Sequence, residues 1–195
     1  MKLYYAPASP FVRMVMVLLH EARAADRVTL VAASGTPLDP GTMPVDRNPL
    51  GKIPALERPD GPTLYDSRVI TRYLDDLLHA DLYPAAPHLW DSLVIEATGD
   101  GIAEAAVQMR YEMHVRPEAT RSQAWTDAQW AKIARALAAL EERWMSHLSS
   151  PIDMGQIAVG CALGYLDLRH SERNWRATCP ALAVWFGAFS TRPSM

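Results

Sequence analysis

The first thirty or so residues alternate between strand and helix patterns, and this alternation is the strongest constraint on the fold. Lys2 to Tyr5 reads as a short strand, and Arg27 to Ala32 as a second one rich in branched residues. Between them, apolar residues recur at helical spacing: Val12, Val15, Met16 and Leu19. Two strands joined by a helix of about this length form a βαβ unit with parallel strands. The sequence therefore predicts an α/β domain at the N-terminus.

The first helix has a clear start signal. Ser9 is a typical N-cap, and Pro10 suits the first helical position, where a missing N–H has no helical partner. Ser9 also follows the first strand, and ligands of open α/β sheets bind at the carboxyl ends of strands. A hydroxyl there can donate a hydrogen bond to a bound thiolate and lower its pKa. Capping alone also explains the residue.

Residues 34–48 read as a loop rich in Pro, Gly and Asp, and Ile53-Pro54 then stands directly before a short apolar strand. A proline can start a strand without disturbing it. If the Ile53–Pro54 bond is cis, the N–H and C=O of Ile53 can face an extended peptide ligand. If it is trans, as most X–Pro bonds are, the proline only opens the strand. Asp60-Gly61 marks a hairpin turn after it.

After the hairpin, Asp66 or Ser67 caps a helix that we expect to reach about Leu78. Its expected inner face comprises Val69, Ile70, Tyr73 and Leu77. The Ser67 N–H and hydroxyl, at a helix N-terminus, can bind a carboxylate, and Asp66 can pair with an ammonium group. An α-amino acid end carries both groups. Capping again explains either residue taken alone.

Everything after a proline-containing linker reads as helical. We expect an α/β domain at 1–79, a linker at 80–87 and an all-helical domain at 88–195. The expected helices are one over 89–114, one that starts at a Thr126–Gln129 capping box and reaches Leu148, one capped by Asp153 with Gln156 reaching back, and one over 180–189. The third is almost wholly apolar to Leu166, which predicts the buried centre of this domain.

Two smaller features of the sequence carry expectations. Gly99 and Gly101 flank Asp100 in mid-helix, where each glycine costs about 1 kcal/mol relative to alanine. We therefore expect a close approach of backbones there, with a subunit contact as one place for it. Cys161 lies in an apolar run and is expected to be buried. Cys179, before Pro180, is expected to be more exposed.

Composition excludes several classes of function. The net charge of -3 argues against nucleic acid as the main partner. No apolar run is long enough to span a membrane, and the N-terminus lacks a secretory signal, so we expect a cytoplasmic protein. The six histidines and two cysteines show no metal-ligand spacing, so we expect no metal.

In their order and spacing, these features resemble the bacterial, Ser-type members of the glutathione S-transferase superfamily. The matching stretches are 9–13, 48–56 and 66–73, with the capped helix from Asp153. The resemblance covers nearly the whole chain and implies a thioredoxin-like N-terminal domain followed by an all-helical domain. It favours the cis form of Pro54. It also implies that Ser9 activates the thiol of glutathione, whereas relatives with cysteine there exchange disulfides.

The resemblance assigns the remaining contacts. Ile53, with Pro54, matches the backbone partner of the cysteinyl part of glutathione, and Asp66 with Ser67 matches the pair that holds its γ-glutamyl end. Lys52 lies where relatives place a contact for the glycyl carboxylate, and Arg13 lies near the site or is structural. The loop before this stretch implies that the second helix of the domain is short or irregular.

The second substrate is expected to be a small hydrophobic electrophile bound between the domains. Candidate contacts are Phe11, Met109, Tyr111 and His114, with Arg110 or Tyr111 able to stabilise developing negative charge. The alternative is a glutathione-binding adaptor or stress-related protein with little or no transferase turnover, because fold does not fix function. Members are usually homodimers, with contacts through the first two helices of the helical domain.

Overall fold

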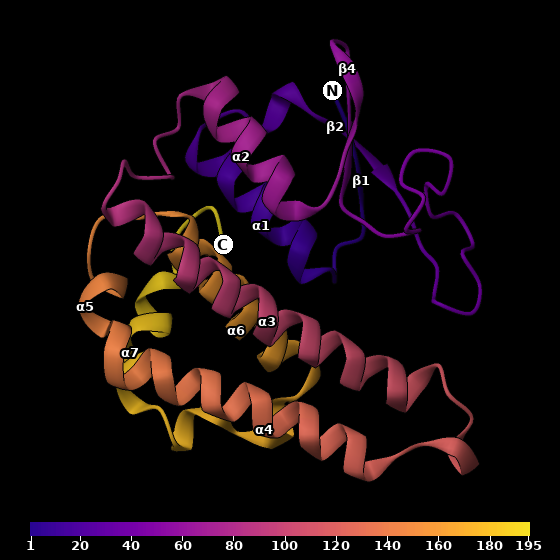
Figure 1. Ribbon diagram of the computed structural model, residues 1–195, viewed down its shortest axis with the longest axis vertical. Coiled ribbons are helices and arrows are strands. Elements are labelled where there is room, and N and C mark those ends of the chain that lie inside the picture. Colours follow the sequence, from indigo (N-terminus) through magenta and orange to yellow (C-terminus); the bar gives the residue numbers. More distant parts are fainter. The chain divides into compact units, whose positions relative to one another are not determined.

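The computed structural model describes residues 1–195 and divides them into two compact units, with the boundary between Tyr83 and Pro84 (Figure 1). The first unit carries a four-stranded sheet and two long helices, and the second is helical throughout. This is the α/β-plus-helical class that the sequence predicted. None of the helices combines the length and apolar character needed to cross a membrane.

The sheet of the first unit is mixed, with strand order β2-β1-β3-β4. Its strands are β1 (Lys2–Tyr5), β2 (Thr29–Ala32), β3 (Ala55–Arg58) and β4 (Gly61–Leu64). β1 pairs in parallel with β2, whereas β3 runs antiparallel to both β1 and β4. The predicted βαβ unit and hairpin are therefore confirmed. β2 begins two residues later than expected, because a 3-10 turn at Ala25–Arg27 precedes it.

The helix α1 (Pro10–Glu21) lies between β1 and β2 in the chain and is buried along most of its length. The predicted apolar face is correct for Val12, Val15 and Leu19, while Met16 is only partly buried. Met14, Val17 and Leu18 are buried as well. The buried surface is wider than one stripe, and part of it packs on α2.

The helix α2 (Ser67–Leu78) buries a face that matches the predicted one only in part, since Ile70 is buried as expected and Tyr73 is partly buried. Val69 and Leu77 are 46% and 38% exposed, and the buried residues are Ser67, Ile70, Thr71 and Leu74. Thr71 can lie inside because its hydroxyl donates to the Ser67 carbonyl oxygen at 3.0 Å and so has an internal partner. The prediction used apolar residues only. It therefore omitted buried polar residues such as Thr71 and included two residues that are exposed.

The segment between β2 and β3 contains no helix, as the proline-rich loop implied. Its turns are held by local hydrogen bonds instead. The backbone N–H groups of Thr36 and Asp39 each donate a hydrogen bond to the carbonyl oxygen of the other residue. The Thr42 N–H donates to the Ser34 carbonyl oxygen at 2.8 Å. Figure 1 shows this segment as an extended loop beside the sheet.

The helical unit is built from five α-helices and short connecting turns. They are α3 (His88–His114), α4 (Gln123–Ala139), α5 (Met145–Leu148), α6 (Met154–Arg169) and α7 (Pro180–Phe189), and the π-helical turn η3 (Leu140–Trp144) joins α4 to α5. As predicted, α6 is buried almost throughout, from Met154 to Leu166. It packs chiefly on α3.

Gly99 is where α3 and α6 come closest. A Cβ built on Gly99 would lie 2.6 Å from the Ala158 carbonyl carbon and 2.8 Å from the Val159 nitrogen. The expected close approach is thus present, and it lies within this unit. Gly101 faces open space, with nothing within 4 Å of such a Cβ. Only the first of the two mid-helix glycines is required by packing.

The start of α4 differs from the prediction. Ser122, not Thr126, caps the helix, because the Ser122 Oγ accepts from the Trp125 N–H at 3.2 Å. Thr126 lies one turn inside and is buried, and its hydroxyl donates to the Ser122 carbonyl oxygen. Ser122 and Thr126 are both suitable N-cap residues by sequence. The course of the chain before the helix makes Ser122 the cap.

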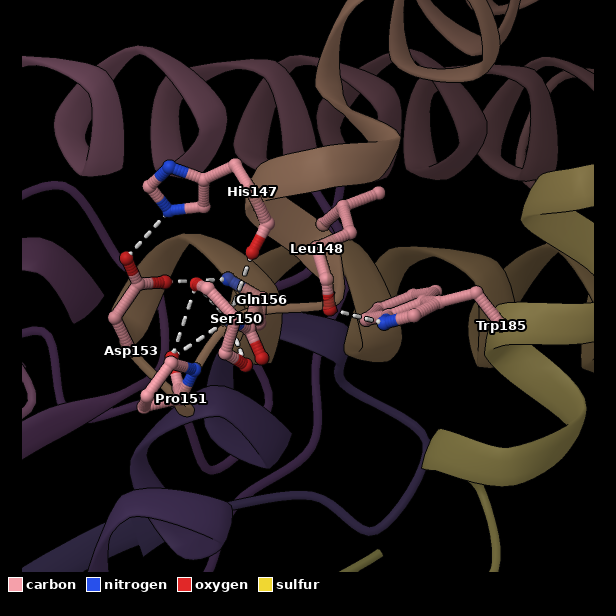
Figure 2. Close-up of polar contacts among 7 residues, drawn as sticks. All are labelled: His147, Leu148, Ser150, Pro151, Asp153, Gln156 and Trp185. Atoms are coloured by element: carbon pink, nitrogen blue, oxygen red, sulfur yellow. Dashed lines mark hydrogen bonds and ion pairs between the residues drawn. The ribbon is translucent and has the colours of Figure 1, made fainter.

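A hydrogen-bonded cluster fixes the start of α6 (Figure 2). As predicted, Asp153 is the cap, since its Oδ1 accepts from the Gln156 N–H at 3.0 Å. The Asp153 Oδ2 also lies 2.7 Å from the His147 Nε2, which ties α5 to α6. The Gln156 side chain does not reach back to the cap. Its Nε2 donates to the Pro151 carbonyl oxygen at 2.8 Å and so holds the connecting turn.

The two cysteines are both buried. This confirms the expectation for Cys161 and corrects it for Cys179. The Cys179 side chain lies inside although the residue precedes a helix, and burial raises the pKa of its thiol. Neither cysteine presents a reactive thiolate at the surface.

Replacing the two mid-helix glycines tests the α3–α6 contact. Gly99→Ala should lower the free energy of unfolding by about 1–3 kcal/mol, because the added methyl group overlaps the α6 backbone. Gly101→Ala is the matched control and should be neutral or stabilising by up to about 1 kcal/mol, since it gains helix propensity in open space. Urea unfolding followed by circular dichroism measures both. Equal effects of the two changes would contradict the packing role of Gly99.

Candidate functional site

Strand register brings three predicted segments to one end of the sheet. Tyr4, near the carboxyl end of β1, pairs with Ala55 at the start of β3. Leu64, at the end of β4, pairs with Leu56 beside it. The chain that leads to Ser9 therefore leaves the sheet at the end where 53–54 enters it and where 66–67 follows β4. Segments that are far apart in sequence converge on this end.

Ser9 serves as the N-cap of α1. Its N–H donates to the Ala6 carbonyl oxygen at 3.0 Å, and its Oγ accepts from the Val12 N–H at 3.3 Å. The cap uses the hydroxyl only as an acceptor. The hydroxyl hydrogen stays available to donate to a bound anion, so the capping and the functional interpretations of Ser9 are compatible.

The Ile53–Pro54 peptide bond is cis, as the resemblance implied. The N–H and C=O of Ile53 take part in no backbone hydrogen bond of the chain. The preceding turn is held by Asn48, a buried residue whose Nδ2 donates to the Lys52 carbonyl oxygen at 2.8 Å. Its Oδ1 accepts from the Leu50 N–H at 3.0 Å. Gly51 completes the turn with a φ of 60°, which favours glycine.

Asp66 and Ser67 form the start of α2. The Asp66 Oδ1 accepts from the Arg68 N–H at 3.1 Å, so Asp66 is the cap, and its Oδ2 lies 3.0 Å from the Arg68 guanidinium. Burial acts to raise the Asp66 pKa, but the hydrogen bonds and charge of Arg68 outweigh it and hold the pKa below its usual value. Asp66 is thus an anion at neutral pH, beside the buried Ser67.

The other candidates of the α/β unit lie around these segments. Phe11 is in the first turn of α1 and is partly buried, while Arg13 is exposed on the same helix. Lys52 is exposed and directly precedes Ile53. An exposed ammonium group next to the free backbone of Ile53 is suitably placed for a carboxylate.

The candidates of the helical unit differ in accessibility. Met109 is buried in the core, Tyr111 is partly buried and His114 is exposed. Desolvation lowers the pKa of His114, and the charges of Arg110 and nearby basic groups lower it further. His114 is therefore mainly neutral at pH 7. No group of three or more His, Cys, Asp or Glu side chains is gathered as metal ligands.

Comparisons with known proteins give the family. Models of the glutathione S-transferase N-terminal and C-terminal domains match residues 8–77 and 123–188. The uncharacterized GST-like protein YibF of Escherichia coli K12 is 32% identical over 188 residues, covering 93% of this chain and 90% of that protein. The chain belongs to the glutathione S-transferase superfamily.

Solved structures agree with this assignment. A glutathione transferase family member from Pseudomonas fluorescens Pf-5 with bound glutathione is 45% identical, with a TM-score of 0.96, over 100% of this chain and 96% of that one. A second structure from the same source holds S-(propanoic acid)-glutathione, with 44% identity, a TM-score of 0.90 and the same coverage. The thioredoxin-like fold with a helical second unit is thereby confirmed.

Sequence reasoning missed the residues that support the site in this superfamily member. Asn48 was noted only as part of a matching stretch, yet its side chain holds the turn before Ile53. Arg68 was not considered, although it pairs with Asp66. An asparagine before Pro49 is a recognisable turn signal, whereas the Arg68 contact depends on the rotamer of a long side chain.

Protonation of His170 should make stability depend on pH. The His170 Nε2 donates to the Ala106 carbonyl oxygen at 2.9 Å, and burial lowers the His170 pKa. The unfolded chain therefore takes up the proton first. Stability should be full above about pH 6.5 and fall as pH drops through the folded-state pKa, by up to about 1.4 kcal/mol per pH unit.

Unfolding curves at several pH values test this, with His170→Gln as control. Gln can still donate to Ala106 but does not titrate, so its stability should change less below pH 6.5. Parallel pH curves for the wild type and the variant would show that another group is responsible.

Proposed function

We propose that this protein binds glutathione through its α/β unit and activates the thiol for reaction with a small electrophile, as a glutathione transferase. The observation that carries this is the convergence of Ser9, the unbonded backbone of Ile53 and the Asp66-Ser67 helix start at one sheet end. Glutathione bound to a relative that is 45% identical supports the choice of ligand. In this proposal the domain at 1–79 binds glutathione, and the domain at 88–195 supplies most of the contacts of the electrophile.

Each part of glutathione has a proposed partner. The N–H and C=O of Ile53, beside Pro54, bond the backbone of the cysteinyl residue in strand fashion. Ser67, at the positive end of α2, takes the γ-glutamyl carboxylate, and Asp66 takes the ammonium group. Lys52 pairs with the glycyl carboxylate. These contacts bind an acidic tripeptide and leave its sulfur directed to Ser9.

Ser9 supplies the chemical step. Its hydroxyl donates to the glutathione sulfur and stabilises the thiolate, and the thiol proton is released to solvent. A shift of about two pKa units from the free-thiol value corresponds to roughly 2.7 kcal/mol and makes the thiolate the main form at neutral pH. The thiolate then forms a C–S bond with the electrophile, and proximity of the bound reactants supplies much of the rate.

Phe11, Tyr111 and His114 are the proposed contacts of the electrophile. Their side chains are accessible at least in part, and the His114 ring and the Tyr111 hydroxyl can donate hydrogen bonds. Met109 belongs to the same proposed set, although its side chain is buried in the core of the helical unit. The S-(propanoic acid)-glutathione held by the Pseudomonas relative shows that a related protein accepts a substituent on the sulfur.

Substitutions of Ser9 test the catalytic role. Ser9→Gly removes the hydroxyl but costs an N-cap only a few tenths of a kcal/mol, so it separates activation from folding. It should still bind glutathione and gain melting temperature from it, but show no thiolate absorbance at pH 7 and at least about a hundredfold lower kcat. Ser9→Thr keeps a hydroxyl and should retain part of the thiolate absorbance and part of the kcat.

The wild type decides between enzyme and adaptor. Glutathione binding without thiolate at pH 7, and without turnover across a panel of electrophiles, would reject the enzyme and leave a glutathione-binding adaptor. Absence of glutathione binding would reject the site itself.

The protein is further proposed to form a homodimer through α3 and α4. Trp90 and Val94, one turn apart on α3, are 62% and 51% exposed, and Trp125 on α4 is also exposed. Sedimentation velocity should give a dimer mass, and Trp90→Glu should shift it toward the monomer. A monomeric wild type would contradict the proposal.

A further inference from the structure

A hydrogen-bonded cluster lies on one face of the sheet in the α/β unit. Leu3 and Leu56 pair across β1 and β3 and are fully buried. Because side chains alternate along a strand, Tyr4 and Glu57 share the opposite face. The Tyr4 hydroxyl donates to the Glu57 Oε1 at 2.5 Å, and the Lys2 Nζ lies 3.7 Å from the Glu57 Oε2. Side chains therefore join β1 to β3 in addition to the backbone ladder.

Arg47 joins this cluster from the segment between β2 and β3. Its Nε donates to the same Glu57 Oε1 at 3.1 Å. The hydrogen bond from Tyr4 lowers the pKa of Glu57 most, and the charges of Lys2 and Arg47 lower it further, so Glu57 is an anion at neutral pH. The same hydrogen bond raises the pKa of Tyr4, which keeps its proton. The Glu57 carboxylate thus accepts from two donors at one oxygen, and the one from Arg47 carries a charge.

The Arg47–Glu57 contact attaches residues 34–52 to the sheet. This segment has no helix or strand of its own. Its other side-chain hydrogen bonds join residues of the segment to one another, as between the Ser34 N–H and the Thr42 hydroxyl or between the Leu50 N–H and Asn48. Among the side chains of the segment, Arg47 is therefore the one that is hydrogen-bonded to a strand.

A single turn connects Arg47 to Ile53. The N–H groups of Arg47 and Asn48 both donate to the Pro44 carbonyl oxygen, at 3.0 and 2.7 Å. The Asn48 Nδ2 in turn donates to the Lys52 carbonyl oxygen at 2.8 Å. That carbonyl belongs to the same planar trans peptide unit as the Ile53 N–H, so the N–H points in the opposite direction. The position of this turn therefore sets the direction of the Ile53 N–H.

We propose that Arg47, anchored on Glu57, is a positioning residue that orients the backbone of Ile53 for glutathione. This inference rests on the proposed function, in which that backbone bonds the cysteinyl residue of glutathione. Arg47 contacts no reacting atom. Its contact with Glu57 keeps the turn at 44–53 in the conformation that binds, so glutathione does not have to select a less populated form at a cost in affinity.

Two substitutions with opposite effects on charge test this role in the full-length protein. Arg47→Ala removes a positive charge and Glu57→Ala removes a negative one, but both break the same contact. Each should raise the Kd of glutathione about fivefold in calorimetric titrations, as expected for the loss of one partly exposed ion pair with a charge-assisted hydrogen bond. If Arg47 acted only by attracting the acidic tripeptide, Glu57→Ala would leave binding unchanged or tighten it.

The double variant tests whether both residues act through one contact. Arg47→Ala combined with Glu57→Ala should also bind about fivefold more weakly than the wild type, because the second change removes nothing further. Independent roles would instead multiply the two effects.

Hydrogen exchange of the ligand-free protein, followed by mass spectrometry, reports on the turn itself. Residues 44–53 should exchange faster in both single variants, because the Leu50 and Gly51 N–H groups are bonded to Asn48 within this turn. The strand β1 should exchange as in the wild type. A general loss of stability would increase exchange in β1 as well.

Matched variants control for charge and for folding. Arg27→Ala removes an exposed positive charge just before β2 and should change neither the Kd of glutathione nor the exchange of 44–53. Arg47→Lys keeps the charge but loses the planar fork and should give an intermediate Kd. If Glu57→Ala does not fold, Glu57→Gln keeps an uncharged acceptor and should raise the Kd by a smaller factor.

The outcomes separate this role from the proposed function. Wild-type affinity for glutathione in Arg47→Ala overturns the positioning role and leaves the proposed function standing. Glutathione binding by Glu57→Ala that equals or exceeds that of the wild type does the same, and so do multiplied effects in the double variant. If the wild type does not bind glutathione, the proposed function and the positioning role are both rejected.

Discussion

The hydrogen bond from a first-turn N–H to the oxygen of a capping side chain is the interaction on which most of this structure depends. Ser9, Asp66 and Asp153 each form one, at the starts of α1, α2 and α6. At Ser9 and Asp66 the helix start also lies at the sheet end where the candidate site is found. The same interaction therefore fixes the helix starts, and at Ser9 it uses the hydroxyl only as an acceptor, so that the hydroxyl hydrogen stays available as a donor.

In the helical unit, close packing of α3 on α6 has a comparable role. Gly99 allows the two backbones to approach, and the His170–Ala106 hydrogen bond sets their register at the far end. This register joins residues that lie 64 positions apart in the sequence, and no local sequence pattern marks the contact.

The sequence predicted elements more reliably than faces. The βαβ unit, the hairpin, the α1 and α6 caps and the buried α6 follow from local signals such as Ser-Pro, Asp-Gly and a long apolar run. The predicted inner face of α2 was right for Ile70 but wrong for Val69 and Leu77, which are exposed. Ser67 and Thr71 are buried instead, and the Thr71 hydroxyl has an internal hydrogen-bond partner in the Ser67 carbonyl oxygen. The predictions for the start of α4 and for the exposure of Cys179 were wrong, because both features depend on the course of the preceding chain.

By itself, the sequence determined the fold class, the family resemblance and the candidate residues Ser9, Ile53 and Asp66-Ser67. These are encoded in short stretches whose caps and turns form from neighbouring residues, so their signals survive without tertiary context. Only the tertiary structure decided that Met109 is buried and that Asn48 supports the turn before Ile53. Burial and charge pairing depend on residues distant in the chain, and strand register and helix packing bring those residues together.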